Sequence, residues 1–280
     1  SGNYGFASIN VTVNNGQKTF GRGTARSIQQ TEDGGYIVAG YTNSFGAGGD
    51  DAYVLKLNST GNLEWQKTFG GTEYDGAYSI QQTSDGGYIV AGETRSFGAG
   101  VEDAYVLKLD SAGNLEWQKT FGGTEYDGAY AIQQTEDGGY IVAGETRSFG
   151  AGGDDAYVLK LDSAGTLQWQ KVFGGSSDDF AYSIQQTSDG GYIVAGYTWS
   201  FGAGSRDVYV LKLDSAGTLQ WQKTFGENRD DVAYSIQQTT DGGYVVAGYT
   251  SSFGAGGLDL YVLYVYVLKL DSNGDLHPFQ

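Results

Sequence analysis

One stretch of the chain decides its fold: Ser79-Ile80-Gln81-Gln82-Thr83-Ser84-Asp85-Gly86-Gly87-Tyr88-Ile89-Val90-Ala91-Gly92. This stretch returns with near-identical residues at a spacing of 52, which makes equivalents of Ile28, Ile80, Ile132, Ile184 and Ile236. A fixed period of this length indicates a repeat architecture, in which one repeat cannot bury its apolar face without a neighbour.

Each repeat is predicted to form four strands, which in the second copy are residues 77–83, 88–93, 104–109 and 115–121. The first two are joined by Asp85-Gly86-Gly87, a strong hairpin signal because glycine tolerates positive φ. The second strand is apolar on both faces, whereas the fourth alternates, which is typical of a strand at the outer edge of a sheet. Four-stranded sheets that bury their faces against one another describe a β-propeller. No segment has the helical period of a helical solenoid.

The two ends of the chain predict a closed ring. Residues 11–21 match the end of a fourth strand, whereas the last copy stops matching at His277-Pro278-Phe279 after its third strand. We therefore expect a single all-β domain, residues 1–280, forming a five-bladed propeller whose N-terminal strand completes the last blade and removes the open edge. The expected blades are residues 27–69, 79–121, 131–173, 183–225, and 235–275 together with 11–21.

The fifth blade departs from the other copies. Tyr261-Val262-Leu263-Tyr264-Val265 is an extra near-copy of the segment that follows it. Five inserted residues would exchange the two faces of a strand unless a bulge or loop absorbs them. We expect the ring to depart from five-fold symmetry here.

Composition excludes several classes of function. The net charge of −17 and pI near 4.2 are incompatible with a phosphate-binding groove, so we expect no nucleic-acid partner. The chain has no cysteine, which excludes disulfides, zinc–thiolate sites and thiol nucleophiles. Its longest apolar run, residues 261–268, is too short to span a bilayer, so we expect no membrane insertion. The start at Ser1, without methionine, suggests a processed or trimmed chain.

Several strings of the repeat resemble the SBBP-type propeller repeats of prokaryotic secreted and cell-surface proteins, with a blade order similar to that of NHL propellers. The matching strings are Phe-Gly-Gly, Tyr-Ser-Ile, Asp-Gly-Gly-Tyr-Ile-Val-Ala-Gly and Asp-Ala-Tyr-Val-Leu-Lys-Leu-Asp, spread over residues 17–275. The resemblance implies an extracellular or cell-surface setting and a scaffold or adhesion-like role. It implies no catalytic residues.

Comparison of the five copies shows where a ligand could bind. The hairpin Asp-Gly-Gly does not vary, whereas variation gathers in the long loop and in the loop between blades. One loop position holds Asn43, Arg95, Arg147, Trp199 and Ser251; a second holds Asp50, Glu102, Asp154, Arg206 and Leu258; a third holds Tyr41, Glu93, Glu145, Tyr197 and Tyr249. We predict a binding face for carbohydrate or protein that uses Trp199, Arg95, Arg147, Tyr197 and Tyr249. The alternative is drift in exposed loops, which tolerate change without function.

Two sets of polar residues recur in every blade or nearly so. Invariant aspartates at Asp51, Asp103, Asp155, Asp207 and Asp259 could bind Ca²⁺, although their spacing matches no calcium loop and favours carboxylates that fix turns. Gln81, Gln82 and their equivalents could line a central channel, or hydrogen-bond between blades as buried amides must.

Catalysis is poorly supported by the sequence, and we name no catalytic residue and expect no cofactor. The single histidine, His277, lies near the C-terminus, away from any recurring motif. The favoured hypothesis is a non-enzymatic structural or binding scaffold. The alternative is a glycoside hydrolase that uses paired carboxylates on a polysaccharide.

Overall fold

The computed structural model describes residues 13–14, 17–253 and 263–279. All regular structure in this part is β-strand. No helix there is long and apolar enough to cross a membrane.

Strands of about seven residues recur close to the predicted ranges, four in each of the first four repeats and three in the described part of the fifth. The innermost are β3 (Thr24–Gln30), β7 (Asp75–Gln82), β11 (Asp127–Gln134), β15 (Asp179–Gln186) and β19 (Asp231–Gln238). The second are β4 (Tyr36–Thr42), β8 (Tyr88–Thr94), β12 (Tyr140–Thr146), β16 (Tyr192–Thr198) and β20 (Tyr244–Thr250). The third are β5 (Asp51–Leu57), β9 (Asp103–Leu109), β13 (Asp155–Leu161), β17 (Asp207–Leu213) and β21 (Tyr264–Leu270). The fourth are β6 (Leu63–Phe69), β10 (Leu115–Phe121), β14 (Leu167–Phe173) and β18 (Leu219–Phe225).

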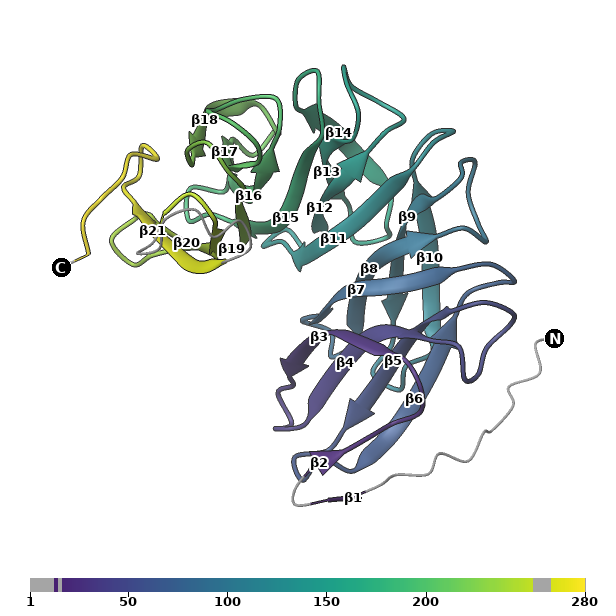
Figure 1. The fold of residues 1–280 in the computed structure, drawn as a ribbon. Coiled ribbons are helices and arrows are strands. Elements are labelled where there is room, and N and C mark those ends of the chain that lie inside the picture. The colour runs from purple at the N-terminus through teal and green to yellow at the C-terminus, as the bar shows by residue number, and fades with distance from the viewer. Residues whose placement is uncertain (1–12, 15–16, 254–262, 280) are drawn as a thin grey trace.

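These strands form antiparallel sheets in chain order, the blades of a propeller-like fold. Four of the sheets have four strands, and the fifth, β19-β20-β21, has three. The blades follow one another along an open arc, with the first strand of each blade on the concave side (Figure 1). We number the blades 1 to 5 in chain order.

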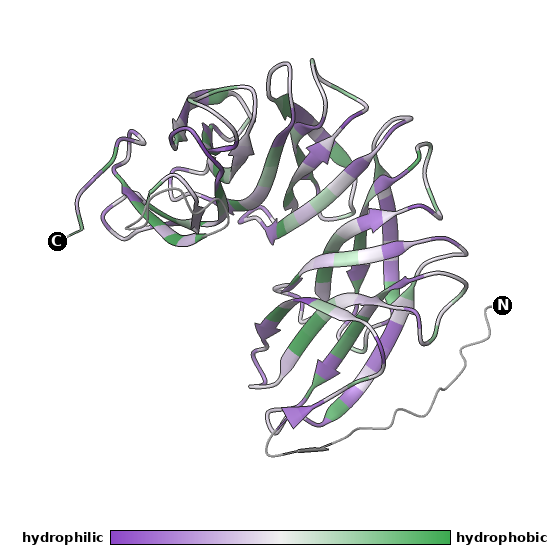
Figure 2. Cartoon of the chain, viewed as in Figure 1, coloured by the Kyte–Doolittle hydropathy of each residue, from purple (hydrophilic) through white to green (hydrophobic). Residues whose placement is uncertain are grey.

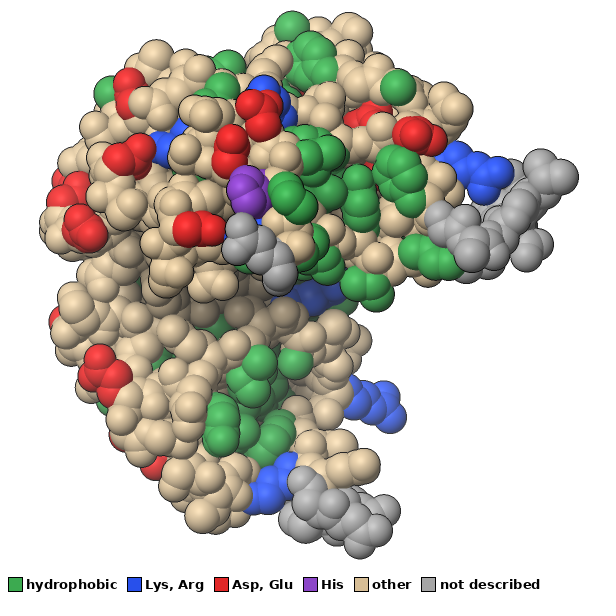
Figure 3. All heavy atoms as spheres, turned by 90° about the vertical axis from the view of Figure 1, so that its left-hand side faces the viewer, with side chains coloured by type: hydrophobic (Ala, Val, Ile, Leu, Met, Phe, Trp, Pro, Cys, Tyr) green, Lys and Arg blue, Asp and Glu red, His purple; other side chains and the backbone are tan. Residues whose placement is uncertain are grey.

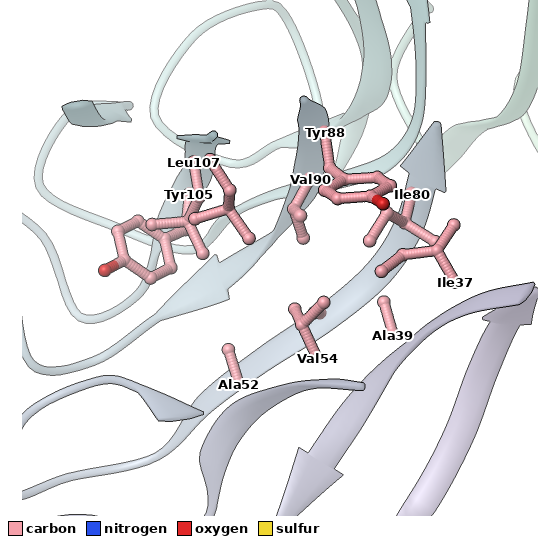
Figure 4. Close-up of a cluster of buried hydrophobic side chains, with 11 residues drawn as sticks. Ile37, Ala39, Ala52, Val54, Ile80, Tyr88, Val90, Tyr105 and Leu107 are labelled. Atoms are coloured by element: carbon pink, nitrogen blue, oxygen red, sulfur yellow. The ribbon is translucent and has the colours of Figure 1, made fainter. Parts of the chain in front are cut away.

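The core lies between blades. Ile37, Ala39, Ala52 and Val54 of blade 1 pack against Ile80, Tyr88 and Val90 of blade 2, all at most 5% exposed; Figure 4 shows this cluster. The same contact recurs at the next three junctions. The second and third strands are therefore apolar on both faces, whereas the outer strands carry polar side chains (Figure 2).

The recurring glutamines join the blades. Gln81 Oε1 accepts a 2.6 Å hydrogen bond from the backbone N–H of Gln134, and Gln82 Oε1 accepts one of 2.9 Å from Glu32 N–H. Their equivalents repeat both bonds at other junctions. Of the two expectations for these amides, the structure shows hydrogen bonds between blades, which satisfy buried polar groups.

The structure differs from the expected ring at its two ends. β2 (Gln17–Lys18) pairs with β1 (Val13–Asn14) and not with β21, so the last blade keeps three strands among the described residues. Phe20, just after β2, packs on Tyr53, Leu55 and Leu57 of blade 1. Apolar contact with blade 1 therefore holds the N-terminal segment at one end of the arc.

The duplicated segment of blade 5 lies partly outside the described residues. β21 pairs with β20 from Tyr264 opposite Thr250 to Leu270 opposite Tyr244. The equivalent pair in blade 4 runs from Asp207 opposite Thr198 to Leu213 opposite Tyr192. The register of β21 is thus unchanged, and any accommodation of the extra residues precedes this strand.

Candidate functional site

The long loops and the loops between blades share one surface, which we call the loop face. Arg95 N–H donates to the carbonyl of Tyr74 in the loop before it, at 2.8 Å. Asp127 N–H donates to the carbonyl of Glu102 across the next junction, also at 2.8 Å. The variable positions therefore come together on one side of the arc, whereas the invariant Asp-Gly-Gly hairpins lie at the opposite ends of the strands.

A row of tyrosines follows the concave side near this face. Every first strand carries a register shift after its first two or three residues, and the residue at the shift is Arg26, Tyr78, Tyr130, Tyr182 or Tyr234. A bulge of this kind redirects one side chain out of the regular alternation. The rings of Tyr78, Tyr130, Tyr182 and Tyr234, which we call the tyrosine row, contact one another across successive blades at 5.5–5.6 Å.

Two buried carboxyl groups lie behind the tyrosine row. Tyr130 Oη donates to Glu145 Oε1 at 2.6 Å, and Tyr78 donates to Glu93 in the same way. Burial raises the pKa of each carboxyl to about 8, and for Glu93 the neighbouring Glu102 adds to this. Glu145 Oε2 is buried without a hydrogen-bond partner in the described structure. Both groups therefore carry a proton at neutral pH and act as neutral polar groups.

Arg95 and Arg147 are held by carboxylates of their own loops. Arg147 makes a two-pronged contact with Asp154, at 2.9 Å and 2.7 Å, and Arg95 Nε lies 2.6 Å from Glu102. Each guanidinium also lies over a tyrosine ring, Tyr74 or Tyr126. Both acids are 7% exposed, so these arginines neutralise buried charge and brace the loops.

Blade 4 reverses this arrangement. Trp199 takes the position of the arginine and Arg206 that of the acid. The Arg206 guanidinium lies 5.0 Å from the ring centre of Tyr197 and 5.3 Å from that of Trp199. Tyr249 of blade 5 lies beside it and helps to raise the pKa of the guanidinium. Three of the five predicted ligand-binding residues, Tyr197, Trp199 and Tyr249, thus meet around one guanidinium; with Arg206 they form what we call the Arg206 cluster.

Exposure within the Arg206 cluster is uneven. Trp199 is 46% exposed, whereas Tyr197 is 7% exposed and stacks on Phe180 with ring centres 4.8 Å apart. Arg206 is half-buried, and its Nε is buried with no hydrogen-bond partner in the described part of the chain. The cluster therefore combines a rigid aromatic base at Tyr197, the exposed indole of Trp199, and a guanidinium with an N–H group that has no hydrogen-bond partner.

The invariant aspartates fix turns. Asp51, Asp103, Asp155 and Asp207 accept backbone N–H bonds of 2.9–3.0 Å from Ala47, Gly100, Ala151 and Ala203. Asp259 lies outside the described residues. Among those described, no group of three or more acidic, histidine or cysteine side chains is arranged to hold a metal ion. The carboxylates visible here are already engaged by their own loops.

Sequence reasoning missed Arg206 as a site residue and missed the tyrosine row. The signal for Arg206 was present, because the two loop positions change together: arginine with an acid in blades 2 and 3, tryptophan with arginine in blade 4. The row depends on a bulge, and strict alternation would place its tyrosines on the wrong face.

Comparison with known proteins supports the fold. Residues 31–64, 83–116 and 187–219 match the family described as "Domain of unknown function (DUF5122) beta-propeller". The arc is similar to a protein of unknown function from Bacteroides caccae, with a TM-score of 0.52, 13% identity, and coverage of 91% of this chain and 80% of that one. It is similar to the Pan2 WD40 domain of Neurospora crassa with the same TM-score and identity, covering 91% of this chain and 78% of that one.

One curated protein is related in sequence over part of its length. Regulatory protein FlaEY of Caulobacter vibrioides is 26% identical over 175 residues, which is 54% of this chain. The match spans only 18% of that protein. Together these likenesses show that the chain is a β-propeller repeat protein.

Proposed function

We propose that this chain is a propeller-type binding module whose ligand, a carbohydrate or a protein surface, contacts the loop face at the Arg206 cluster. The observation that carries the proposal is the meeting of Tyr197, Trp199 and Tyr249 around Arg206, in one place of an otherwise repetitive molecule. Exposed aromatic groups with a rigid backing suit such ligands, because they supply contact area at little cost in entropy. We place the module at the cell surface or outside the cell, as the repeat resemblance implies.

A matched pair of variants tests this proposal. Trp199→Ala removes the exposed indole of blade 4, and Arg147→Ala changes the equivalent position of blade 3, where the side chain is tied to Asp154. Glycan-array binding and pull-downs should lose at least tenfold in signal with the first variant and little with the second. Unchanged binding by Trp199→Ala would rule out the loop-face site.

A second candidate function, hydrolysis of a polysaccharide, is supported by the raised pKa of Glu145 and Glu93. A protonated carboxyl can serve as a general acid in glycoside hydrolysis, but the reaction also needs an ionised partner. Glu93 and Glu145 are both neutral, so they can supply a general acid but not the ionised partner. Binding is therefore the better-supported function. A screen of polysaccharides for released reducing sugar, with Glu145→Gln as control, tests the alternative.

We also propose that the scaffold closes into a five-bladed ring through a fourth strand shared by both ends of the chain. Ile28 is 66% exposed and Val265 87% exposed, whereas their equivalents Ile80 and Val208 are 5% and 1% exposed at the packed junctions. Figure 3 shows hydrophobic side chains on both walls of the gap between the ends of the arc. The two ends thus expose the two halves of a contact that the chain makes four times.

The contacts at each end support the shared strand. Lys18 Nζ donates to Asn62 of blade 1 at 2.8 Å. At the junction of blades 4 and 5, Lys223 of the fourth strand β18 donates to the equivalent residue Asp275 at 2.7 Å. β2 therefore contacts blade 1 as the fourth strand of a preceding blade would. On blade 5, Leu276 forms an isolated antiparallel β-bridge with Leu270, as Leu115 pairs with Leu109 in blade 2, and Pro278 has no N–H with which to extend this pairing. Register taken from blade 2 would place Gln17 opposite Leu268 and Phe20 opposite Val265.

A further inference from the structure

The guanidinium of Arg206 differs from those of Arg95 and Arg147. Those two have carboxylate partners at 2.6 Å and 2.7 Å. Arg206 forms no ion pair with any described residue, and its buried Nε has no hydrogen-bond acceptor. In a chain with a net charge of −17, a partly buried guanidinium that makes no direct salt bridge is a feature that packing alone does not require.

Its surroundings hold the guanidinium in place. Tyr197 and Trp199 lie on it at 5.0 Å and 5.3 Å, and both contacts are within the range of cation–π attraction. Tyr249 of the next blade lies beside it. The arginine therefore needs little further ordering to bind a ligand, which preserves the free energy gained from the contact.

The Arg206 guanidinium has the chemistry of an anion-binding group. A guanidinium presents parallel N–H donors that match the two oxygens of a carboxylate or sulfate. Asp230 lies close by, since its Oδ1 accepts a 3.3 Å bond from the backbone N–H of Arg206, but it does not pair with the guanidinium. The half-exposed Trp199 ring beside it offers a flat apolar surface of the kind that covers a sugar ring.

We propose that the Arg206 cluster recognises an acidic sugar, with Arg206 binding the anionic substituent and Trp199 covering the ring. This inference rests on the proposed binding function and narrows its ligand to a polysaccharide that carries carboxylate or sulfate groups. The acidic surface of the protein repels polyanions at long range, so discrimination comes from this one contact and not from general attraction.

Isothermal titration with matched oligosaccharides tests the inference. The probes are an oligogalacturonate pentamer, its fully methyl-esterified counterpart and a sulfated galactan oligosaccharide of similar length. The intact protein should bind at least one anionic probe at least tenfold more tightly than the neutral ester, and the stronger of the two identifies the anion. That preference should weaken as NaCl is raised from 50 to 300 mM, as a charge contact requires.

Three variants complete the experiment. Arg206→Met should abolish the preference for the anionic probe, and Arg206→Lys, which keeps the charge but not the fork, should restore part of it. Arg147→Met, a variant of an arginine already paired with Asp154, should leave the preference intact. A circular dichroism melt of each variant confirms that it is folded.

The outcomes separate this inference from the proposed function. Equal affinity for acid and ester, or a preference that survives in Arg206→Met, overturns the acidic-sugar assignment while glycan binding that depends on Trp199 stands. Failure of the intact protein to bind any of the three probes, together with a blank glycan array, overturns both.

Discussion

Tyr130 on β11 donates a 2.6 Å hydrogen bond to Glu145 on β12, and this pair joins the tyrosine row to a carboxyl group whose second oxygen is buried without a partner. The bond exists because the bulge at Tyr130 turns its side chain out of the strand's alternation. The equivalent pair, Tyr78 and Glu93, repeats it one blade earlier.

These carboxyls predict that the protein loses stability as the pH rises from acidic to mildly alkaline values. The folded-state pKa of Glu93 and Glu145, about 8, lies above the ordinary value of 4.5. The native state therefore holds protons that the unfolded chain releases, and stability declines as pH rises from about 4.5 through 8. We expect the melting temperature to fall between pH 5 and pH 9. The double variant Glu93→Gln/Glu145→Gln should flatten that slope, and an unchanged slope would contradict the assignment.

Ring closure predicts a specific cross-link. Lys18→Cys with Val267→Cys places the only two thiols of the chain at positions equivalent to Lys119 and Val106, which are opposite one another in blade 2. Under mild oxidation we expect a disulfide within a single chain, seen as a shift on non-reducing gels. Lys119→Cys with Val106→Cys is the control for geometry. Cross-linked dimers, or no product where the control reacts, would count against closure within the chain.

Gly122 should not tolerate a side chain. A Cβ there would lie 2.5 Å from Asp127 Oδ2 and 2.6 Å from Asp103 Oδ1, the carboxylates that hold the two adjoining loops. We expect Gly122→Ala to lower the free energy of unfolding by about 2–3 kcal/mol, as overpacking does. Gly86→Asn is the control: its φ of 80° suits asparagine, and a Cβ there meets nothing within 4 Å. Urea denaturation measures both, and equal effects would contradict the argument.

Lys108 should contribute to stability although it is charged. Its ammonium group is buried between Asp85 Oδ2 at 2.9 Å, Glu116 Oε2 at 3.0 Å and the carbonyl of Leu109 at 3.1 Å. Lys108→Met removes the one ammonium group that these three acceptors share and should cost about 1–2 kcal/mol. Lys119→Met on the exposed side of the same blade should cost much less. A thermal melt that does not distinguish the two variants would refute the role given to Lys108.

The blades were predictable from sequence because strand, turn and burial signals agree in every copy. The alternation of residues 115–121 and the doubly apolar residues 88–91 correspond to an outer and a central strand in the structure. Contacts that depend on geometry between elements were not predictable. The bulge at Tyr78 leaves no mark in periodicity, and the pairing of Arg95 with Glu102 becomes visible only when two loop positions are compared across copies.

The position of the N-terminal segment was also not predictable from the sequence, for a different reason. The sequence identifies residues 17–20 as the end of a fourth strand and predicts that they complete the last blade, but in the structure β2 pairs with β1 and not with β21. At the position of Trp65, Trp117, Trp169 and Trp221, the N-terminal segment has Gly16. Each of those tryptophans packs on the turn glycine of the next blade, whereas Gly61 of blade 1 has the end of the Lys18 side chain beside it, with Nζ nearest. A weaker anchor makes the location of this segment depend on competing contacts.

The repeated junction between blades also affects how such a chain can change over time. Every blade contacts the next one through the same pair of complementary surfaces. Deletion or duplication of one 52-residue unit therefore joins two surfaces that already fit each other. Recombination between near-identical copies can therefore alter the size of the scaffold in a single event, without any new interface having to evolve. The two variable loop positions of a blade, such as Arg95 and Glu102, lie in the same repeat, so the same exchange can also change the order of the loop residues around the scaffold.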